Sequence, residues 1–92
     1  MVNALRIHPK DTVVVALMDL APGTVVEIEG GLEPPVVTVQ AIPFGHKVAI
    51  APIKQGEQVI KYGASIGVAV KDIAPGEHVH THNLKSIRGR AQ

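Results

Sequence analysis

Short apolar runs rich in Val and Ile recur along the 92-residue chain, and Gly or Pro bounds each of them. Val and Ile branch at the β-carbon, which favours extended strands over helices. No long stretch carries an uninterrupted helical period, so the pattern predicts an all-β fold with at most one or two helical turns. The close, even spacing of the runs is typical of many short strands in a small barrel-like or clip-like structure. The expected strands are 12–18, 25–29, 36–42, 47–53, 58–61, 65–70 and 78–82.

Four copies of the pattern Gly-x-x-Val mark places where strands are expected to begin. Their glycines are Gly23, Gly45, Gly56 and Gly76. In three copies an Ile or Leu lies three residues before the Gly, which predicts a strand end, a tight turn with a positive φ at the Gly, and the next strand. Pro22 and Pro75 each precede a Gly, which suits a type II turn with Pro second and Gly third.

The segment 30–35 contains the densest group of strand breakers and predicts a hairpin loop or a mobile flap. After Asn83 the strand pattern stops, and the last four residues are expected to fray. A chain this short supports one hydrophobic core. We therefore expect a single domain over residues 1–84, followed by a C-terminal tail over residues 85–92.

Composition narrows the classes of function. Hydrophobic residues make up 46% of the chain, yet Phe44 and Tyr62 are its only aromatic residues. Nine basic and eight acidic residues are interspersed, and this balance, with so few aromatic rings, argues against nucleic acid as a partner. The absence of Cys excludes disulfides and thiolate metal sites. The N-terminus lacks the features of a signal peptide and no apolar run is long enough to span a membrane, so we expect a soluble cytoplasmic protein.

Three histidines alternate near the C-terminal end, at His78, His80 and His82. Alternate residues of a strand share one face and lie roughly 7 Å apart, near enough for two imidazoles to converge on one metal ion with a third ligand from elsewhere. Imidazole suits several transition metals, so the pattern does not name one. A histidine also serves as a general acid or base near neutral pH. A solvated strand face that is merely rich in His is the alternative, and the pattern leaves both open.

A second candidate site lies at His46 and Lys47, directly after the turn glycine Gly45. An imidazole and an ammonium group at the mouth of a strand are suited to an anionic substrate, with Lys47 as the counter-ion of a carboxylate. Lys61 and Tyr62 offer similar chemistry. A lone Lys is nevertheless more often a solvated charge, and Tyr62 is somewhat more readily explained as a core anchor.

The remaining polar residues are explained by turns. Asp72 and Glu77 flank a turn and are expected to cap it. The segment 8–11 precedes the first strand, and its residues favour a turn. The sequence contains no Ser-His-Asp order, phosphate loop or nucleotide fingerprint.

Several of these motifs resemble one known family. The segments 45–50, 59–67 and 72–83 resemble the N-terminal SAF domain of altronate and galactarate dehydratases, and the segments 7–11 and 14–20 are similar to its opening strand. The likeness covers nearly the whole chain, and the motif at 72–83 is long and unusual. The resemblance implies a β-clip fold.

The resemblance also implies an activity. Enzymes of this family are hydro-lyases that convert a sugar acid, such as altronate or galactarate, to a 2-keto-3-deoxy acid, commonly with Fe²⁺ or Mn²⁺. In the two-domain members the chain continues past the position of Asn83 into a large catalytic domain, whereas this sequence ends at Gln92. We therefore expect the small subunit of a split enzyme, inactive alone and dependent on a separate large catalytic subunit.

Dehydration next to a carboxylate needs a base, an acid for the leaving hydroxyl, and a metal or cation that holds the developing enediolate. For this reaction, our hypothesis assigns proton transfer or metal binding to three histidines, with a fourth as a further metal ligand. Sugar-acid binding is assigned to two lysines, a tyrosine and an asparagine. The residues are His46, His80 and His82 for catalysis, His78, His80 and His82 for the metal, and Lys47, Lys61, Tyr62 and Asn83 for the substrate.

Three alternatives remain. The chain is also similar to the alpha subunit of (2R)-sulfolactate sulfo-lyase, which shares the ending His-Asn-Leu-Lys-Ser at 82–86 and expels sulfite instead of water. A non-catalytic SAF module that binds carbohydrate, like those of pilus and flagellar assembly proteins, is the second. A metal-binding β-protein without any partner is the third. In each case the strand edges of so small a domain are consistent with weak self-association.

Overall fold

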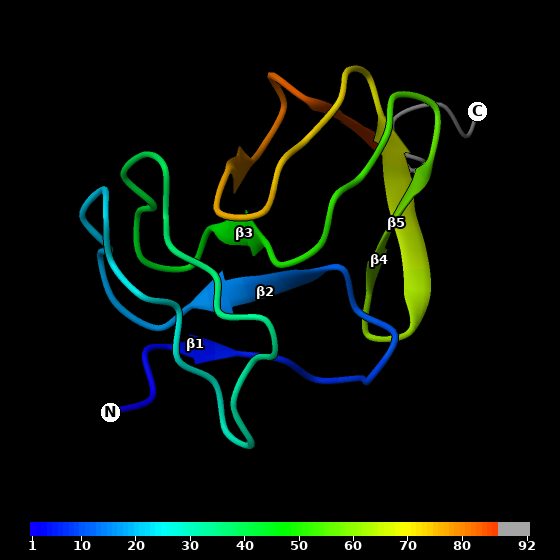
Figure 1. Ribbon diagram of the computed structural model, residues 1–92. Helices are drawn as coiled ribbons and strands as arrows, with labels where there is room; N and C mark the ends of the chain where they lie inside the picture. Colours follow the sequence, from blue (N-terminus) through cyan, green and yellow to red (C-terminus); the bar gives the residue numbers. More distant parts are fainter. Residues whose placement is uncertain (87–92) are drawn as a thin grey trace.

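In the computed structural model, which describes residues 1–86, the apolar runs form short β-strands in two antiparallel sheets (Figure 1). The first sheet has the order β1-β2-β3-β6 and the second the order β4-β5-β7. The strands are β1 (Ala4–Leu5), β2 (Val13–Ala16), β3 (Lys47–Ala49), β4 (Gln58–Lys61), β5 (Ala64–Ala69), β6 (His78–Val79) and β7 (Leu84–Ser86). Within residues 1–86 there is no helix, so the prediction of an all-β fold is confirmed.

Two aliphatic clusters fill the interior, one on each face of the central pair β2 and β3. Val14 and Val48 belong to one cluster, and Val13 and Ala49 belong to the other. Successive side chains of a strand point to opposite faces, so these neighbouring residues contribute to both clusters. The first cluster is completed by residues of the 20–42 region, and the second by residues of β4, β5 and β6. Neither cluster contains an aromatic side chain.

The four glycine turns come in two matched pairs. Each Gly has a φ between 82° and 92°, which confirms the predicted turns with a left-handed glycine. A buried aliphatic residue lies three positions before every one of them, including Ile42 before Gly45, which the sequence analysis did not count. These residues pair across the molecule as Leu20 with Ile42 and Ile53 with Ile73. Reciprocal backbone hydrogen bonds of 2.7–2.9 Å join each pair, so the turns are fixed two by two.

A carboxylate supports a turn in each pair. The Phe44 amide donates to Asp19 Oδ1 at 2.8 Å, and the Gln55 amide donates to Asp72 Oδ1 at 2.9 Å. The Ala74 amide donates to Glu77 Oε2 at 2.8 Å. The prediction that Glu77 caps the turn that it flanks is therefore confirmed, whereas Asp72 caps the partner turn at Gln55.

A two-residue hairpin, Tyr62-Gly63, joins β4 to β5, and both residues have positive φ, 58° and 73°. This combination defines a type I′ turn, whose twist matches that of the flanking strands. The turn is tied to the chain before β2, because the Gly63 amide donates to Asp11 Oδ1 at 2.7 Å. Burial alone would raise the pKa of the Asp11 carboxyl, but the backbone N–H groups that donate to it, first that of Gly63 and then that of His8, together lower its pKa.

Parts of the strand prediction were wrong. The segments 25–29 and 36–42 are not continuous strands, and only an isolated bridge between Val25 and Val37 joins them. The strand expected over 78–82 ends at Val79, and residues 81–83 form a turn. The boundary expected at residue 84 is also too early, because Lys85 and Ser86 pair with β5. The predicted fraying of the last four residues lies outside the described part of the chain.

We predict that Gly76→Ala destabilises the fold more than Gly23→Ala. Both substitutions force a left-handed Ala, at a cost of about 1–2 kcal/mol. A β-carbon on Gly76 would also lie 2.1 Å from the carbonyl oxygen of Val37, whereas none of the surrounding atoms comes within 4 Å of one on Gly23. Relieving that clash is expected to cost about 1–3 kcal/mol more. Urea unfolding of both variants measures the difference, and equal losses would contradict the observed approach to Val37.

Candidate functional site

Four imidazole rings gather where β3 and β6 pair. The antiparallel register places Val48 opposite His78, and His46 directly precedes β3. His80 and His82 follow β6 in the turn that leads to β7. The prediction from alternation grouped only the last three histidines, and the pairing of β3 with β6 adds His46 to them. His46 and His78 are half-buried, whereas His80 and His82 are exposed.

The rings are close enough to influence one another directly. The ring centroid of His46 lies 5.0 Å from that of His78 and 4.9 Å from that of His80. The centroid of His78 lies 5.6 Å from those of His80 and His82. His46 Nδ1 and His78 Nε2 share one hydrogen bond of 2.8 Å, so one of these two nitrogens carries the proton and the other accepts it. We call these four residues the histidine cluster.

Asn83 is the residue that shapes this turn. Its side chain is fully buried; Nδ2 donates to the carbonyl oxygen of His78 at 2.8 Å and Oδ1 accepts from the amide of His80 at 2.9 Å. Both ends of the amide are therefore used by backbone groups on either side of Val79. Asn83 thus fixes the positions of His78 and His80, and its predicted contact with the substrate stays a prediction. No signal in the sequence indicated these backbone contacts.

The electrostatics of the cluster favour the neutral form of His78. Burial lowers the pKa of His78, and the charges that His46, His82, His80 and Lys47 would carry lower it further. A pKa below its ordinary value leaves His78 unprotonated at neutral pH. A neutral ring has one nitrogen lone pair, which can accept a proton. The cluster is thus suited to proton transfer at neutral pH.

Two lysines and a tyrosine extend the site from the histidine cluster to the β4–β5 hairpin. Burial lowers the pKa of Lys47, and the nearby Lys61 charge lowers it further. Lys61 Nζ lies 4.6 Å from the ring centroid of Tyr62, in a cation–π contact. Tyr62 is 55% exposed, so the explanation of this residue as a core anchor was wrong. Ring contacts and the influence of neighbouring charges therefore link seven of the eight predicted site residues, and the eighth, Asn83, bonds to the backbone of the cluster.

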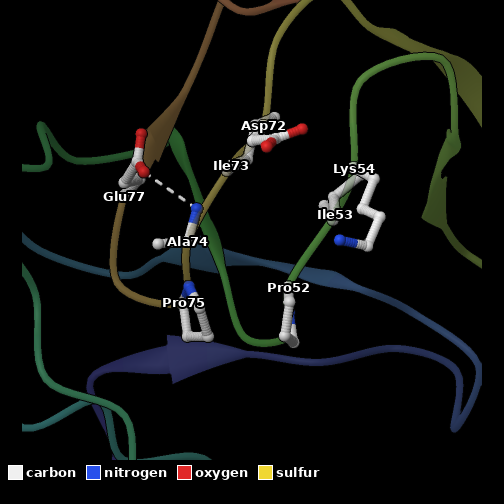
Figure 2. A pocket seen from close by; sticks show the side chains of 8 residues that line it. All are labelled: Pro52, Ile53, Lys54, Asp72, Ile73, Ala74, Pro75 and Glu77. Carbon is white, nitrogen blue, oxygen red and sulfur yellow. Dashed lines mark hydrogen bonds between the residues drawn. The ribbon is translucent and has the colours of Figure 1, made fainter.

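Two hollows of the described surface are lined by none of the four histidines. One of about 250 Å³ lies between the segments 52–54 and 72–77, beside the paired turns. Figure 2 shows the side chains that line it. The dashed line in that view is the hydrogen bond from the Ala74 amide to Glu77. The carboxylates of Asp72 and Glu77 are engaged in such turn contacts and are poorly placed to bind a ligand. The histidine cluster itself lies on an open surface.

The donor chemistry of the cluster suits a transition metal, since neutral imidazole is a common ligand. Within residues 1–86, however, no three imidazole or carboxylate side chains converge closely enough to hold one ion. The nitrogens of His46 and His78 that lie closest together share a hydrogen bond. A metal held by His78, His80 and His82 would need those side chains to turn, and the site stays a prediction.

Comparisons with known proteins agree with these features. Residues 2–87 match the family model described as the altronate/galactarate dehydratase SAF domain. The altronate dehydratase of Escherichia coli is 46% identical over 82 residues, which are 89% of this chain and 16% of that protein. The altronate dehydratase of Bacillus subtilis is 37% identical over 89 residues, which are 94% of this chain and 17% of that protein. The chain thus spans about a sixth of the length of these relatives.

A shorter relative matches part of the chain more closely. The (2R)-sulfolactate sulfo-lyase subunit alpha of Paracoccus pantotrophus is 55% identical over 47 residues, which are 51% of this chain and 70% of that subunit. Separately, none of the described residues forms a helix of the length and apolarity needed to cross a membrane.

We predict that Asn83→Ala disturbs the histidine cluster as well as the fold. The substitution leaves the His78 carbonyl and the His80 amide without their partner, at a cost of about 1–3 kcal/mol. Asn3→Ala is the matched control, because buried Asn3 bridges the backbone of Val25 and Glu27 in the same way, away from the cluster. Urea unfolding should show a loss for both variants.

NMR signals of the histidines distinguish an effect on the cluster from an effect on overall stability. Only Asn83→Ala is expected to shift the imidazole C–H signals of the cluster in NMR spectra. If Asn3→Ala shifts them equally, Asn83 has no specific part in placing the rings.

Proposed function

Because the chain belongs to the altronate/galactarate dehydratase SAF-domain family, we propose that it is the small part of a lyase that removes water from a sugar acid. The substrate is altronate or galactarate, and the product is a 2-keto-3-deoxy acid. The observation that carries this proposal is the group of four imidazoles where β3 pairs with β6, with Lys47 and, next to it, Lys61 close enough for their charges to interact. That group offers proton transfer beside positive charges suited to an anion.

The lysines supply the attraction for substrate. Burial and the neighbouring ammonium both disfavour the charged form of Lys47. Within residues 1–86, neither Lys47 nor Lys61 forms a salt bridge with a carboxylate. A substrate carboxylate between Lys47 and Lys61 would offset this repulsion and favour both charges. Charge-assisted hydrogen bonds to carboxylate are among the stronger ones, and the pair also favours the dianionic enediolate as it develops.

The histidines supply the proton transfers. A base removes the proton on the carbon next to the carboxylate, the electron pair forms the enediolate, and the neighbouring hydroxyl leaves as water after it is protonated. The resulting enol rearranges to the keto acid. Neutral His78, hydrogen-bonded to His46, leaves that pair free to accept a proton, and exposed His80 and His82 are proposed to protonate the leaving hydroxyl. These assignments divide the acid and base work among the cluster.

A larger catalytic chain is proposed to close the site. His80, His82 and Tyr62 are all exposed, whereas an enediolate is stabilised best where water is excluded. The altronate dehydratases that match this chain are about six times longer, so most of each lies outside the matched part. We place the completed enzyme in the cytoplasm. A divalent ion, Fe²⁺ or Mn²⁺, belongs to the proposal for the assembled enzyme, and no step above depends on it.

Sulfolactate is the second candidate substrate. The Paracoccus pantotrophus sulfo-lyase subunit is itself small, since 47 matched residues make up 70% of it. The proton removal next to the carboxylate would be the same, but sulfite would leave in place of water. The cluster and the lysines fit both reactions, so the products must distinguish them.

We predict that the assembled two-chain enzyme turns over altronate or galactarate, and that replacing His80 and His82 with Ala lowers kcat by about 10²–10⁴-fold. Keto-acid formation and sulfite release are measured on altronate, galactarate and sulfolactate. Sulfite release would support the alternative reaction. Unchanged turnover in a variant that still assembles, as judged by size-exclusion chromatography, would rule out a catalytic part for these two histidines.

We predict that Lys47→Met raises KM for the sugar acid by about tenfold or more, because one charge-assisted contact to the carboxylate is lost. Lys71→Met is the matched control, because Lys71 is exposed on the segment after β5. Its charge is not among the causes of the lowered pKa values of Lys47 and His78. Steady-state kinetics of both variants are compared at one ionic strength. Equal KM values would show that Lys47 does not bind the carboxylate.

A further inference from the structure

Tyr62 has a backbone conformation that side chains with a β-carbon rarely adopt. Within residues 1–86, Tyr62 is the one residue other than Gly that has a positive φ, and its φ is 58°. Type I′ hairpins normally place Asn, Asp or Gly at this position, because those residues tolerate left-handed backbone. Tyr62 is also 55% exposed, so packing of its ring does not enforce the conformation. Another contact must hold the turn.

Asp11 provides that contact. Its side chain is 3% exposed, and its two oxygens accept from two different parts of the chain. The Gly63 amide donates to Oδ1 at 2.7 Å and the His8 amide donates to Oδ2 at 3.0 Å. The His8 ring lies against Gly63, where an added β-carbon would come within 2.9 Å of it. A buried carboxylate thus joins the loop before β2 to a hairpin turn 52 residues later.

The turn held in this way carries two of the proposed substrate-binding residues. Lys61 ends β4 and Tyr62 follows it, and their side chains meet in the cation–π contact of 4.6 Å. The charge of Lys61 contributes to lowering the pKa of Lys47, and the charge of Lys47 contributes to lowering the pKa of His78. The turn is therefore linked electrostatically to the histidine cluster. If the turn relaxed to an ordinary backbone, Lys61 and Tyr62 would change direction together.

We infer that Asp11 is a positioning residue of the lyase: its carboxylate holds the Tyr62-Gly63 turn in left-handed backbone so that Lys61 and Tyr62 face the substrate. This inference rests on the proposed function, because it is the sugar acid that the two residues would meet. The carboxylate itself is buried and touches no substrate. A strained residue on an exposed turn, held by a buried charge, is typical of a ligand-binding loop.

The first test uses the chain alone. Tyr62 is the only tyrosine and the chain has no tryptophan, so tyrosine emission reports on this turn. Asp11→Asn removes the charge and one acceptor, and we expect the fluorescence anisotropy of Tyr62 to fall while the far-ultraviolet circular dichroism is retained. Asp72→Asn, which weakens a similar carboxylate contact at the Gln55 turn, should leave the anisotropy unchanged. Equal anisotropy in wild type and Asp11→Asn would overturn the inference.

The second test uses the assembled enzyme and a turn that does not need Asp11. Asn adopts left-handed backbone readily, so Tyr62→Asn gives the Asn-Gly sequence that forms type I′ turns by itself. Asp11→Asn alone should raise KM about tenfold, or about 1.4 kcal/mol, with kcat changed less than about twofold. In the Tyr62→Asn background the same change at Asp11 should leave KM unaltered. Equal effects in the two backgrounds would overturn the inference.

Two further outcomes are decided in the same experiments. If Asp11→Asn does not fold, recovery of the fold in the double variant with Tyr62→Asn supports the coupling, and failure to recover overturns it. If the assembled enzyme acts on none of the three acids, the proposed function fails. The anisotropy measurement then still decides whether Asp11 holds the turn.

Discussion

The pairing of β3 with β6 is the constraint on which the rest of this site depends. Its register sets Lys47 opposite Val79 and Val48 opposite His78, although these partners are far apart in the sequence. Val48 and Val79 are fully buried, so the aliphatic core enforces the register. A shift by one residue would turn each side chain to the opposite face. The same hydrophobic contacts that stabilise the domain therefore bring His46 and Lys47 to the other histidines.

The grouping of ionisable side chains in the site is unfavourable for the folded domain when they are charged. The pKa values of His78 and Lys47 are both lowered, which means that the folded surroundings disfavour their charged forms. Such groups lie together only because the strands on which they sit are fixed by other contacts. The buried amide of Asn83 and the paired glycine turns supply those contacts. An anionic substrate would reverse the penalty, which is why this unfavourable grouping is suited to binding.

The sequence predicted the local structure best and the long-range structure least. The limits of β4 and the left-handed glycines followed from short patterns, because a turn glycine and a run of branched residues act over a few positions. The segment 25–42 was misjudged, since alternation there is real but only isolated bridges form, Val25 to Val37 within it and Leu20 to Ile42 at its end. Membership of the cluster was predicted for three histidines from alternation. The joining of His46 to them required the strand pairing, which spacing alone does not reveal.

Asp11, and the backbone contacts of Asn83, show why some roles were not predicted from the sequence. Each is a buried polar residue whose partners are backbone groups, of His78 and His80 in one case and of His8 and Gly63 in the other. A residue that binds backbone leaves no pattern of side-chain types for a motif to capture. Both are nevertheless placed where a loop must be held rigid beside exposed reactive side chains. In a small domain with an aliphatic core, these buried hydrogen bonds hold the surface loops in one conformation. The side chains proposed to contact the substrate are positioned by those loops.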